Sequence, residues 1–195
     1  TEPLANTVHV LGIAEAEPVR TMLIIGAGTQ GSLATVLARR AGIERIAVSE
    51  TDPARLALAG ELGAHLCLNP RVADVAEEVR HWSEGGVDLV LDAVGSSKAR
   101  STAAASARKG GRVILLGLHD QASDLDFASV VRNEITLIGS FSYTRRDFAE
   151  ALRLLQSGEV DPSPYVRTMP LARGQEAFEV IERGPGTVLK ILLVP

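Results

Sequence analysis

Cysteine is nearly absent from this sequence, since Cys67 is the only one among 195 residues. A single cysteine excludes a disulfide within the chain and any zinc site built from several of its own cysteines. Residues 63–70, GAHLCLNP, indicate a short buried strand, so we expect Cys67 to be a structural thiol rather than a nucleophile. The histidines form no H-E-x-x-H or H-x-H motif and are expected to be ordinary surface or core residues: His9, His65, His81 and His119.

Long apolar runs and a strong charge of one sign are missing as well. No run approaches the roughly 20 apolar residues that span a bilayer, and the first residues lack the basic, apolar, A-x-A order of a secretion signal. The formal net charge of −4 does not support nonspecific binding to nucleic acid or to a membrane surface. With 46% hydrophobic, 23% charged and 4% aromatic residues, the composition predicts a globular α/β protein, which we expect to be cytoplasmic.

Short apolar runs alternate with helical patterns through residues 19–160, which is typical of a parallel sheet. Strands are predicted at residues 21–25, 45–50, 64–69, 87–95, 112–117 and 135–141. Helices are predicted at residues 32–42, 53–63, 72–82, 97–111 and 145–158. The sequence therefore predicts a doubly wound, six-stranded parallel sheet. A helix and a turn are expected in residues 1–18, and a strand, a helix and a closing strand in residues 161–195.

Three glycines in the spacing G-x-G-x-x-G lie between the first predicted strand and the first predicted helix of this repeat. In a dinucleotide-binding loop, Gly26 would permit a tight turn, Gly28 would let the backbone approach a pyrophosphate, and Gly31 would let helix and strand pack closely. The positive end of the helix dipole would face the phosphates. The alternative is a glycine-rich turn that binds nothing.

An acidic residue follows the second predicted strand, where a dinucleotide-binding fold holds the adenosine ribose. This residue is Glu50, which lies 19 positions after Gly31. Its charge would repel a 2′-phosphate and favours NAD over NADP, whereas the nearby Arg55 could serve a phosphate. A methyltransferase can also combine a glycine-rich turn with such an acid, so the pattern alone leaves hydride transfer unproven.

Seven segments resemble one known family in both order and spacing. They are EPLANTVHVLGIA, GAGTQG, SETDPARLALAGELGA, VDLVLDAVG, GGRVILLGL, SFSYTRRDFAEALRLLQSGEVD and VLKILLVP. Together they resemble the cofactor-binding half of the medium-chain, zinc-type alcohol dehydrogenases, nearest the sorbitol and threonine dehydrogenase branch. The resemblance implies a Rossmann domain at residues 19–160, a linker helix at 1–18 and a return segment toward a GroES-like catalytic domain at 161–195.

The resemblance also implies roles for individual residues. The pyrophosphate loop would consist of Gly26, Gly28, Thr29, Gln30 and Gly31, and Glu50 would hold the adenosine ribose, with Arg55 as a further cofactor-binding candidate. The loop that lines the adenosine side would be Ala93, Val94 and Gly95. The nicotinamide carboxamide would meet backbone at Leu116, Gly117, Leu118, Ser140 and Phe141. The basic residue of the closing strand, Lys190, would contact the pyrophosphate.

Two departures from the family pattern concern the loop and the metal. The family usually has a proline and an aliphatic residue where this chain has Thr29 and Gln30, so its loop is expected to make different hydrogen bonds. The family's zinc ligands lie in a catalytic domain that precedes this segment, and we expect zinc in the intact enzyme but not on this chain. Glu2 is the one candidate metal contact, although an acid at a helix start is also favoured by the dipole.

The expected function is the NAD-binding part of a zinc-dependent alcohol or polyol dehydrogenase, with hydride passing between an alcohol and the nicotinamide. Such a part is expected to bind NAD without turning over its alcohol or ketone substrate. The metal and the proton relay that the reaction requires would belong to its partner, the catalytic domain. Two alternatives are a zinc-free, NADPH-dependent quinone-type reductase and a non-catalytic NAD-binding or oligomerisation module. The resemblance also implies a homodimer or homotetramer, and an apolar edge strand near residues 135–141 agrees with it.

Overall fold

The computed structural model describes residues 1–14, 18–184 and 186–195. Six strands form one parallel sheet in the spatial order β3-β2-β1-β4-β5-β6. They are β1 (Thr21–Ile25), β2 (Arg45–Ser49), β3 (Leu66–Leu68), β4 (Val87–Asp92), β5 (Ala107–Leu115) and β6 (Thr136–Gly139). The chain runs outward from the centre twice, first through β1 to β3 and then through β4 to β6. This order confirms the predicted doubly wound sheet.

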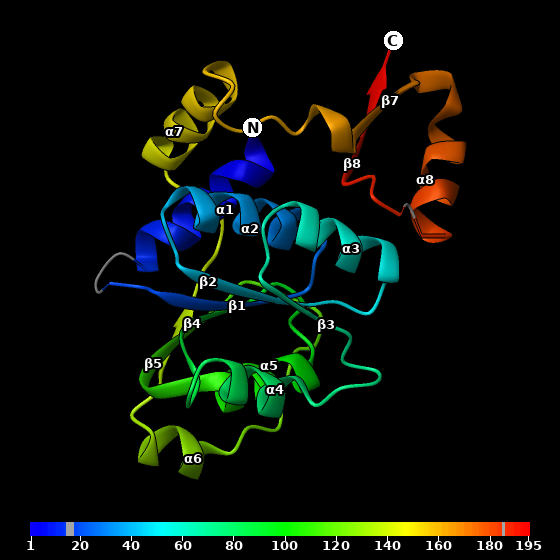
Figure 1. The fold of residues 1–195 in the computed structure, drawn as a ribbon. Helices are drawn as coiled ribbons and strands as arrows, with labels where there is room; N and C mark the ends of the chain where they lie inside the picture. The colour runs from blue at the N-terminus through cyan, green and yellow to red at the C-terminus, as the bar shows by residue number, and fades with distance from the viewer. Residues whose placement is uncertain (15–17, 185) are drawn as a thin grey trace.

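Helices cover both faces of the sheet (Figure 1). One face carries α1 (Glu2–Ala14), α2 (Thr29–Arg40) and α3 (Pro53–Glu61), with α7 (Arg145–Gln156) packed against α1. The other face carries α4 (Val75–Trp82), α5 (Ser97–Ser106) and α6 (Phe127–Arg132). Both faces of the central strands are therefore buried, which explains their nearly continuous apolar sequences.

Alternate residues of β1 enter two different cores. Met22 and Ile24 pack in the cluster that contains residues of α1, α2 and α3, whereas Leu23 and Ile25 pack in the cluster with residues of α4 and α5. Met22, Leu23 and Ile24 are each 0% exposed. The two-residue period of the strand thus divides its side chains between the two helical layers.

A small C-terminal unit follows the six-stranded sheet. It contains β7 (Val166–Pro170), α8 (Gly174–Glu182) and β8 (Lys190–Val194), with 3-10 turns at Ser163–Tyr165 and Leu171–Arg173. Strands β7 and β8 pair in parallel as a separate two-stranded sheet, which confirms the predicted strand, helix and closing strand. The N-terminal helix is confirmed too, while the turn expected after it falls largely on residues 15–17, outside the described residues. Within the described chain, no helix combines the length and apolar character that crossing a membrane requires.

The predicted helix at residues 97–111 is partly wrong. Helix α5 ends at Ser106, and the chain enters β5 at Ala107, which pairs with Val87 of β4. The register between β4 and β5 shifts just after this pair. Gly86 makes room for the shift, because a Cβ there would lie 2.6 Å from the backbone nitrogen of Arg108. Strand pairing thus overrides the helical preference of this segment.

Three further details differ from the expectations. Val72 does not belong to the core stripe of the next helix: it is 86% exposed, and α4 begins only after Asp74, whose side chain caps it. Cys67 lies in β3 as predicted, but it is exposed rather than buried, because β3 is the edge strand of the sheet. Helix α6 was not predicted, since its six residues are too few to show a helical period.

Candidate functional site

The glycine loop joins β1 to α2 at the carboxyl edge of the sheet, and its three glycines differ in what surrounds them. Gly26 has a φ of +93°, which L side chains rarely adopt, and a Cβ there would lie 2.7 Å from Val94. A Cβ on Gly31 would lie 1.8 Å from the carbonyl oxygen of Gly26, whereas a Cβ on Gly28 would meet nothing within 4 Å. The turn and the close packing therefore require Gly26 and Gly31, while Gly28 leaves its backbone open to an approaching group.

The backbone N–H groups in the first turn of α2 have no side-chain cap. Its N-cap is Gly28, which supplies no side-chain hydrogen bond. By contrast, α3, α4, α5 and α7 are each capped by a side chain, namely Asp52, Asp74, Ser96 and Thr144. The uncapped N–H groups and the helix dipole make this end of α2 suited to an anion such as a pyrophosphate.

Glu50 directly follows β2 and is held by backbone donors. One carboxylate oxygen accepts hydrogen bonds from the backbone N–H groups of Thr51 at 2.6 Å and Asp52 at 2.9 Å, and from the Thr51 hydroxyl. The other accepts only from the Ala27 N–H of the glycine loop, at 2.8 Å. Because a carboxylate oxygen can accept more than one bond, this second oxygen remains able to accept from a ribose hydroxyl.

A pocket of about 250 Å³, here called the β2 pocket, lies beside Glu50. Its lining includes Gly26, Glu50, Val94 and two basic residues, Arg71 and Lys98. The sequence analysis missed both basic residues, because they lie in a loop and a helix that only the folded chain brings to this edge. Val94 of the predicted adenosine-side loop therefore lies in the same pocket as Glu50, while Ala93 packs against the core.

A second pocket of about 630 Å³, the β6 pocket, lies beyond the ends of β5 and β6. It brings together four of the five residues predicted to meet the nicotinamide: Gly117, Leu118, Ser140 and Phe141. The fifth, Leu116, packs against the core instead. Leu118 is 78% and Phe141 81% exposed, so two large apolar side chains flank this opening.

Asp92 links the loops between the β2 and β6 pockets. Its buried carboxylate accepts the N–H groups of Val94 at 3.0 Å and Gly95 at 2.8 Å, and its backbone oxygen accepts those of Leu116 and Gly117. Burial raises the pKa of this carboxyl, and the two N–H groups offset only part of that effect. The sequence analysis missed Asp92, although an acid that ends an otherwise apolar strand was a usable signal.

Gly95 and Gly117 let these two loops touch backbone to backbone. A Cβ on Gly95 would lie 2.2 Å from the carbonyl carbon of Gly117. Asp120 adds two hydrogen bonds between the same loops. Its N–H donates to the carbonyl oxygen of Gly95, and its carboxylate accepts the N–H of Ser97. That N–H, followed by His119, holds the pKa of Asp120 below its usual range. The walls of both pockets are thus fixed to each other.

A third pocket, the C-terminal pocket, joins the glycine loop to the C-terminal unit. It measures about 260 Å³, and its lining includes Thr29, Arg55 and Lys190. The Thr29 hydroxyl donates to the Leu189 carbonyl oxygen at 2.6 Å. Gln30 points elsewhere, since its side-chain oxygen accepts the hydroxyl of Thr7 in α1 at 3.0 Å. The predicted pyrophosphate residues are therefore brought together except for the side chain of Gln30.

Buried polar atoms without a partner are concentrated at this edge of the sheet. Among the described residues they are Arg55 Nε, Asp92 Oδ2 and Ser140 Oγ. Arg55 lines the C-terminal pocket and Ser140 the β6 pocket, while Asp92 lies between the β2 and β6 pockets. Buried polar groups in proteins are almost always paired with protein, water or a ligand, so a ligand or water atom can pair with these three. The residues at this edge therefore fit a dinucleotide.

Glu2 lies apart from these pockets, at the start of α1. It is exposed, and its carboxylate accepts a hydrogen bond from the Asn6 side chain at 2.7 Å. Within the described chain, no three His, Cys, Asp or Glu side chains gather where they could hold a metal ion. These residues do not by themselves fit a zinc site, and a metal contact by Glu2 stays a prediction.

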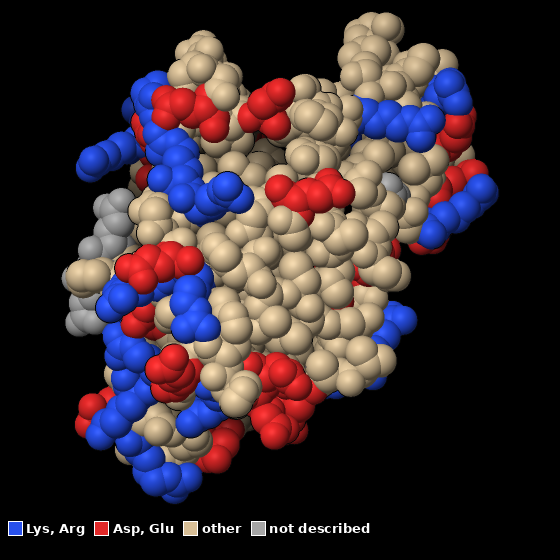
Figure 2. Space-filling model, viewed as in Figure 1, with Lys and Arg blue, Asp and Glu red and all other residues tan. Residues whose placement is uncertain are grey.

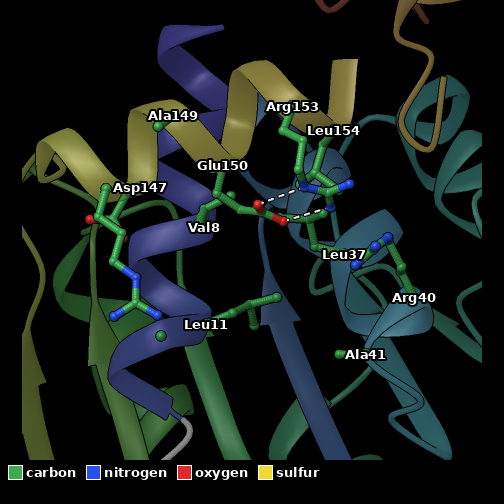
Figure 3. A pocket seen from close by; sticks show the side chains of 12 residues that line it. Val8, Leu11, Leu37, Arg40, Ala41, Asp147, Ala149, Glu150, Arg153 and Leu154 are labelled. Atoms are coloured by element: carbon green, nitrogen blue, oxygen red, sulfur yellow. Dashed lines mark hydrogen bonds and ion pairs between the residues drawn. The ribbon is translucent and has the colours of Figure 1, made fainter. Parts of the chain in front are cut away.

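The helical hollow, of about 710 Å³, lies between α1, α2 and α7 (Figure 3). Its lining combines apolar and charged side chains, including Val8, Leu11, Leu37, Leu154, Arg40, Glu150 and Arg153. Arg153 pairs with Glu150 and Glu159, and Arg40 pairs with Glu159. Figure 2 shows positive and negative side chains alternating around α7. Arg40 ends α2, about 16 Å from the glycine loop, so this hollow is separate from the carboxyl edge.

Comparison with known proteins agrees with this geometry. A model of the family described as zinc-binding dehydrogenase matches residues 31–157, from the third glycine of the loop to the end of α7. The chain belongs to this family. The match confirms the expected Rossmann domain of a zinc-type dehydrogenase.

Individual relatives agree with the expected branch. The chain is 34% identical to L-threonine 3-dehydrogenase of Symbiobacterium thermophilum and 30% identical to sorbitol dehydrogenase of Bacillus subtilis, in each case over 100% of this chain and 56% of the relative. A crystal structure of a zinc-binding dehydrogenase from Sinorhizobium meliloti, bound to NADP, matches with a TM-score of 0.87 at 27% identity, over 100% of this chain and 58% of that one. The chain thus spans about half the length of the curated relatives it matches.

Proposed function

We propose that this chain binds NAD along the carboxyl edge of its sheet, as the cofactor-binding part of an alcohol or polyol dehydrogenase. The observation that carries the proposal is the glycine loop, where Gly28 leaves an uncapped helix end open beside the acid Glu50. The pyrophosphate would lie on the first turn of α2, the adenosine in the β2 pocket and the nicotinamide in the β6 pocket. Residues 19–160 would form this unit, and residues 161–195 would contribute Lys190.

The chain's own residues would bind and orient the cofactor rather than carry out the chemistry. The nicotinamide, when bound, supplies hydride acceptance and donation. Glu50 would accept a ribose hydroxyl, and Lys190 would neutralise the pyrophosphate charge. The fixed contact between Gly95 and Gly117 would keep the distance between the two ends of the cofactor constant. The names of the two relatives support an alcohol as the substrate, and the zinc is proposed to bind outside the described residues.

NADP is a second candidate cofactor, favoured by one specific observation. Arg71 and Lys98 line the β2 pocket together with Glu50 and could pair with a 2′-phosphate. The NADP-bound relative supports the same candidate. We favour NAD because the Glu50 carboxylate is fixed in the pocket by four donors and would lie close to that phosphate.

Titration with NADH and NADPH, followed by nicotinamide fluorescence, tests the cofactor and its preference. We expect NADH to bind more tightly, and Glu50→Gln to weaken NADH about tenfold, the effect of losing one charged hydrogen bond. Glu44→Gln is the matched control, because Glu44 pairs with Arg20 at the opposite edge of the sheet. Tighter binding of NADPH would support the second candidate. Binding of S-adenosylmethionine without NADH would contradict the dehydrogenase assignment.

A further inference from the structure

Thr29 and Gln30 are adjacent in the first turn of α2. Their side chains form hydrogen bonds with opposite ends of the chain. The Thr29 hydroxyl donates to the carbonyl oxygen of Leu189, 160 positions later in the chain. The Gln30 side chain accepts from Thr7 in α1. The side chains of the loop therefore connect it to both of its flanking segments, α1 and the segment before β8.

The hydroxyl of Thr29 cannot also donate to a phosphate. A threonine hydroxyl has one proton, and here that proton lies on the 2.6 Å bond to Leu189. The Leu189 N–H in turn donates to the Tyr165 carbonyl oxygen at 2.8 Å. The Leu189 residue is therefore held on both sides, by α2 and by the start of the C-terminal unit. While this bond is in place, the Thr29 side chain acts on an anion only through this segment.

The next residue along the chain is a cation without an anionic partner. Lys190 begins β8 and lines the C-terminal pocket together with Thr29 and Arg55. Among the described residues, Lys190 forms no ion pair and the buried Nε of Arg55 has no hydrogen-bond partner. Two basic residues thus line the same pocket as Thr29, which belongs to the first turn of α2.

We propose that Thr29 is a positioning residue, whose bond to Leu189 holds the Lys190 ammonium beside the pyrophosphate-binding turn of α2. The inference rests on the proposed function, since it assigns the way in which the C-terminal unit contributes to that same site. Without the bond, the segment before β8 can move away from α2. The Lys190 ammonium is then no longer held near the phosphates. The N–H groups of α2 bind the phosphates without it.

The test compares NADH binding by the wild-type chain and by five variants. Thr29→Val removes the hydroxyl at nearly constant shape, and Thr29→Ser restores it. Lys190→Met removes the cation and is also combined with Thr29→Val. Thr7→Val is the matched control, because it makes the same change at the neighbouring bond between α1 and Gln30, which does not lead to a cation. Each titration is run at low and high salt, with adenosine as a probe that lacks the pyrophosphate. Urea unfolding checks that every variant is folded.

Thr29→Val is expected to weaken NADH binding about fivefold at low salt, from the loss of a positioned charge–charge contact. The loss should shrink at high salt because salt screens exposed charges. Thr29→Ser and Thr7→Val should bind like the wild type, and adenosine should bind equally to all. The double variant should bind no more weakly than Lys190→Met alone, because both changes remove the same contact.

The inference is overturned if Thr29→Val binds NADH as the wild type does, or if the losses of the two single variants multiply in the double variant. A loss that is equal for adenosine and NADH would also overturn it, since it would reflect a general distortion of the loop. These outcomes leave the proposed function intact, because the wild type binds NADH in each of them. Failure of the wild type to bind NADH would instead overturn the proposed function, and this inference with it.

Discussion

The helical hollow is larger than any of the three pockets at the carboxyl edge, about 710 Å³ against 250, 630 and 260 Å³. Four of the five charged side chains that line it nevertheless have partners within the chain: Arg40 and Arg153 pair with Glu159 and Glu150, and Asp147 pairs with His9. The smaller pockets border uncapped N–H groups and unpaired buried polar atoms. The difference supports the proposed site, because a ligand can satisfy the free hydrogen-bonding groups at the carboxyl edge, whereas most charged groups of the larger hollow already have partners.

The largest effects are expected from substitutions of two glycines in the loop. One glycine is required for packing and the other for binding, so the two substitutions should affect different quantities. Gly31→Ala should destabilise the chain by about 3 kcal/mol, the upper end for overpacking, because the new methyl group meets Gly26 backbone. Gly28→Ala should change the unfolding free energy by less than about 0.5 kcal/mol and weaken NADH binding at least about tenfold. Urea unfolding and NADH titration measure the two effects. Equal losses of stability in both variants would contradict the assigned roles.

Asp92 tests whether the wall between the β2 and β6 pockets depends on a buried acid. Asp92→Ala leaves the N–H groups of Val94 and Gly95 without their acceptor and should cost about 1–3 kcal/mol of unfolding free energy. Asp92→Asn keeps an acceptor oxygen and should cost less.

Asp92→Asn also tests how the free energy of unfolding depends on pH. Burial raises the pKa of Asp92 in the folded state, so its stabilising effect is complete below the ordinary value of about 4 and is lost as the pH rises through the folded-state pKa. Asn cannot ionise. Asp92→Asn should therefore gain stability relative to the wild type between about pH 4 and pH 7. A relative loss over that interval, measured by urea unfolding, would contradict the assignment.

The smallest effect is expected in the helical hollow. Arg153, and after it Arg40, lower the pKa of Glu159 to about 2. The stabilising effect of Glu159 is thus complete above its ordinary pKa of about 4.3 and is lost as the pH falls toward 2. The wild type should lose more stability than Glu159→Gln over this interval, and less so at high salt. NADH affinity at neutral pH should be unchanged, and a loss of affinity would connect this hollow to the cofactor.

The fold and the centre of the site could be predicted because their signals are local in the sequence. The glycine spacing, the acid after the second strand and the alternation of strands and helices each depend on neighbouring residues. The bond from Thr29 to Leu189 could not be predicted, since it joins residues 160 positions apart. The contact of Gly95 with Gly117 likewise requires β4 and β5 to be paired first.

Errors arose where a local preference competed with pairing in the sheet. Residues 107–111 follow an alanine-rich helix and were assigned to it, but Ala107 pairs with Val87 in the sheet. Cys67 was expected to be buried because its neighbours are apolar, yet β3 is the edge strand and leaves the thiol exposed. Neither fact can be read from the residues beside it in the sequence.

The most direct test of the account is an NMR titration of the isotope-labelled chain with NADH, which reports on every backbone amide at once. The account predicts that the amides of Gly28 to Gly31, Val94, Gly95 and Gly117 shift on binding, while those of Arg40, Glu150 and Arg153 do not. Shifts confined to the helical hollow, with the glycine loop unchanged, would contradict the claim that the carboxyl edge is the cofactor site.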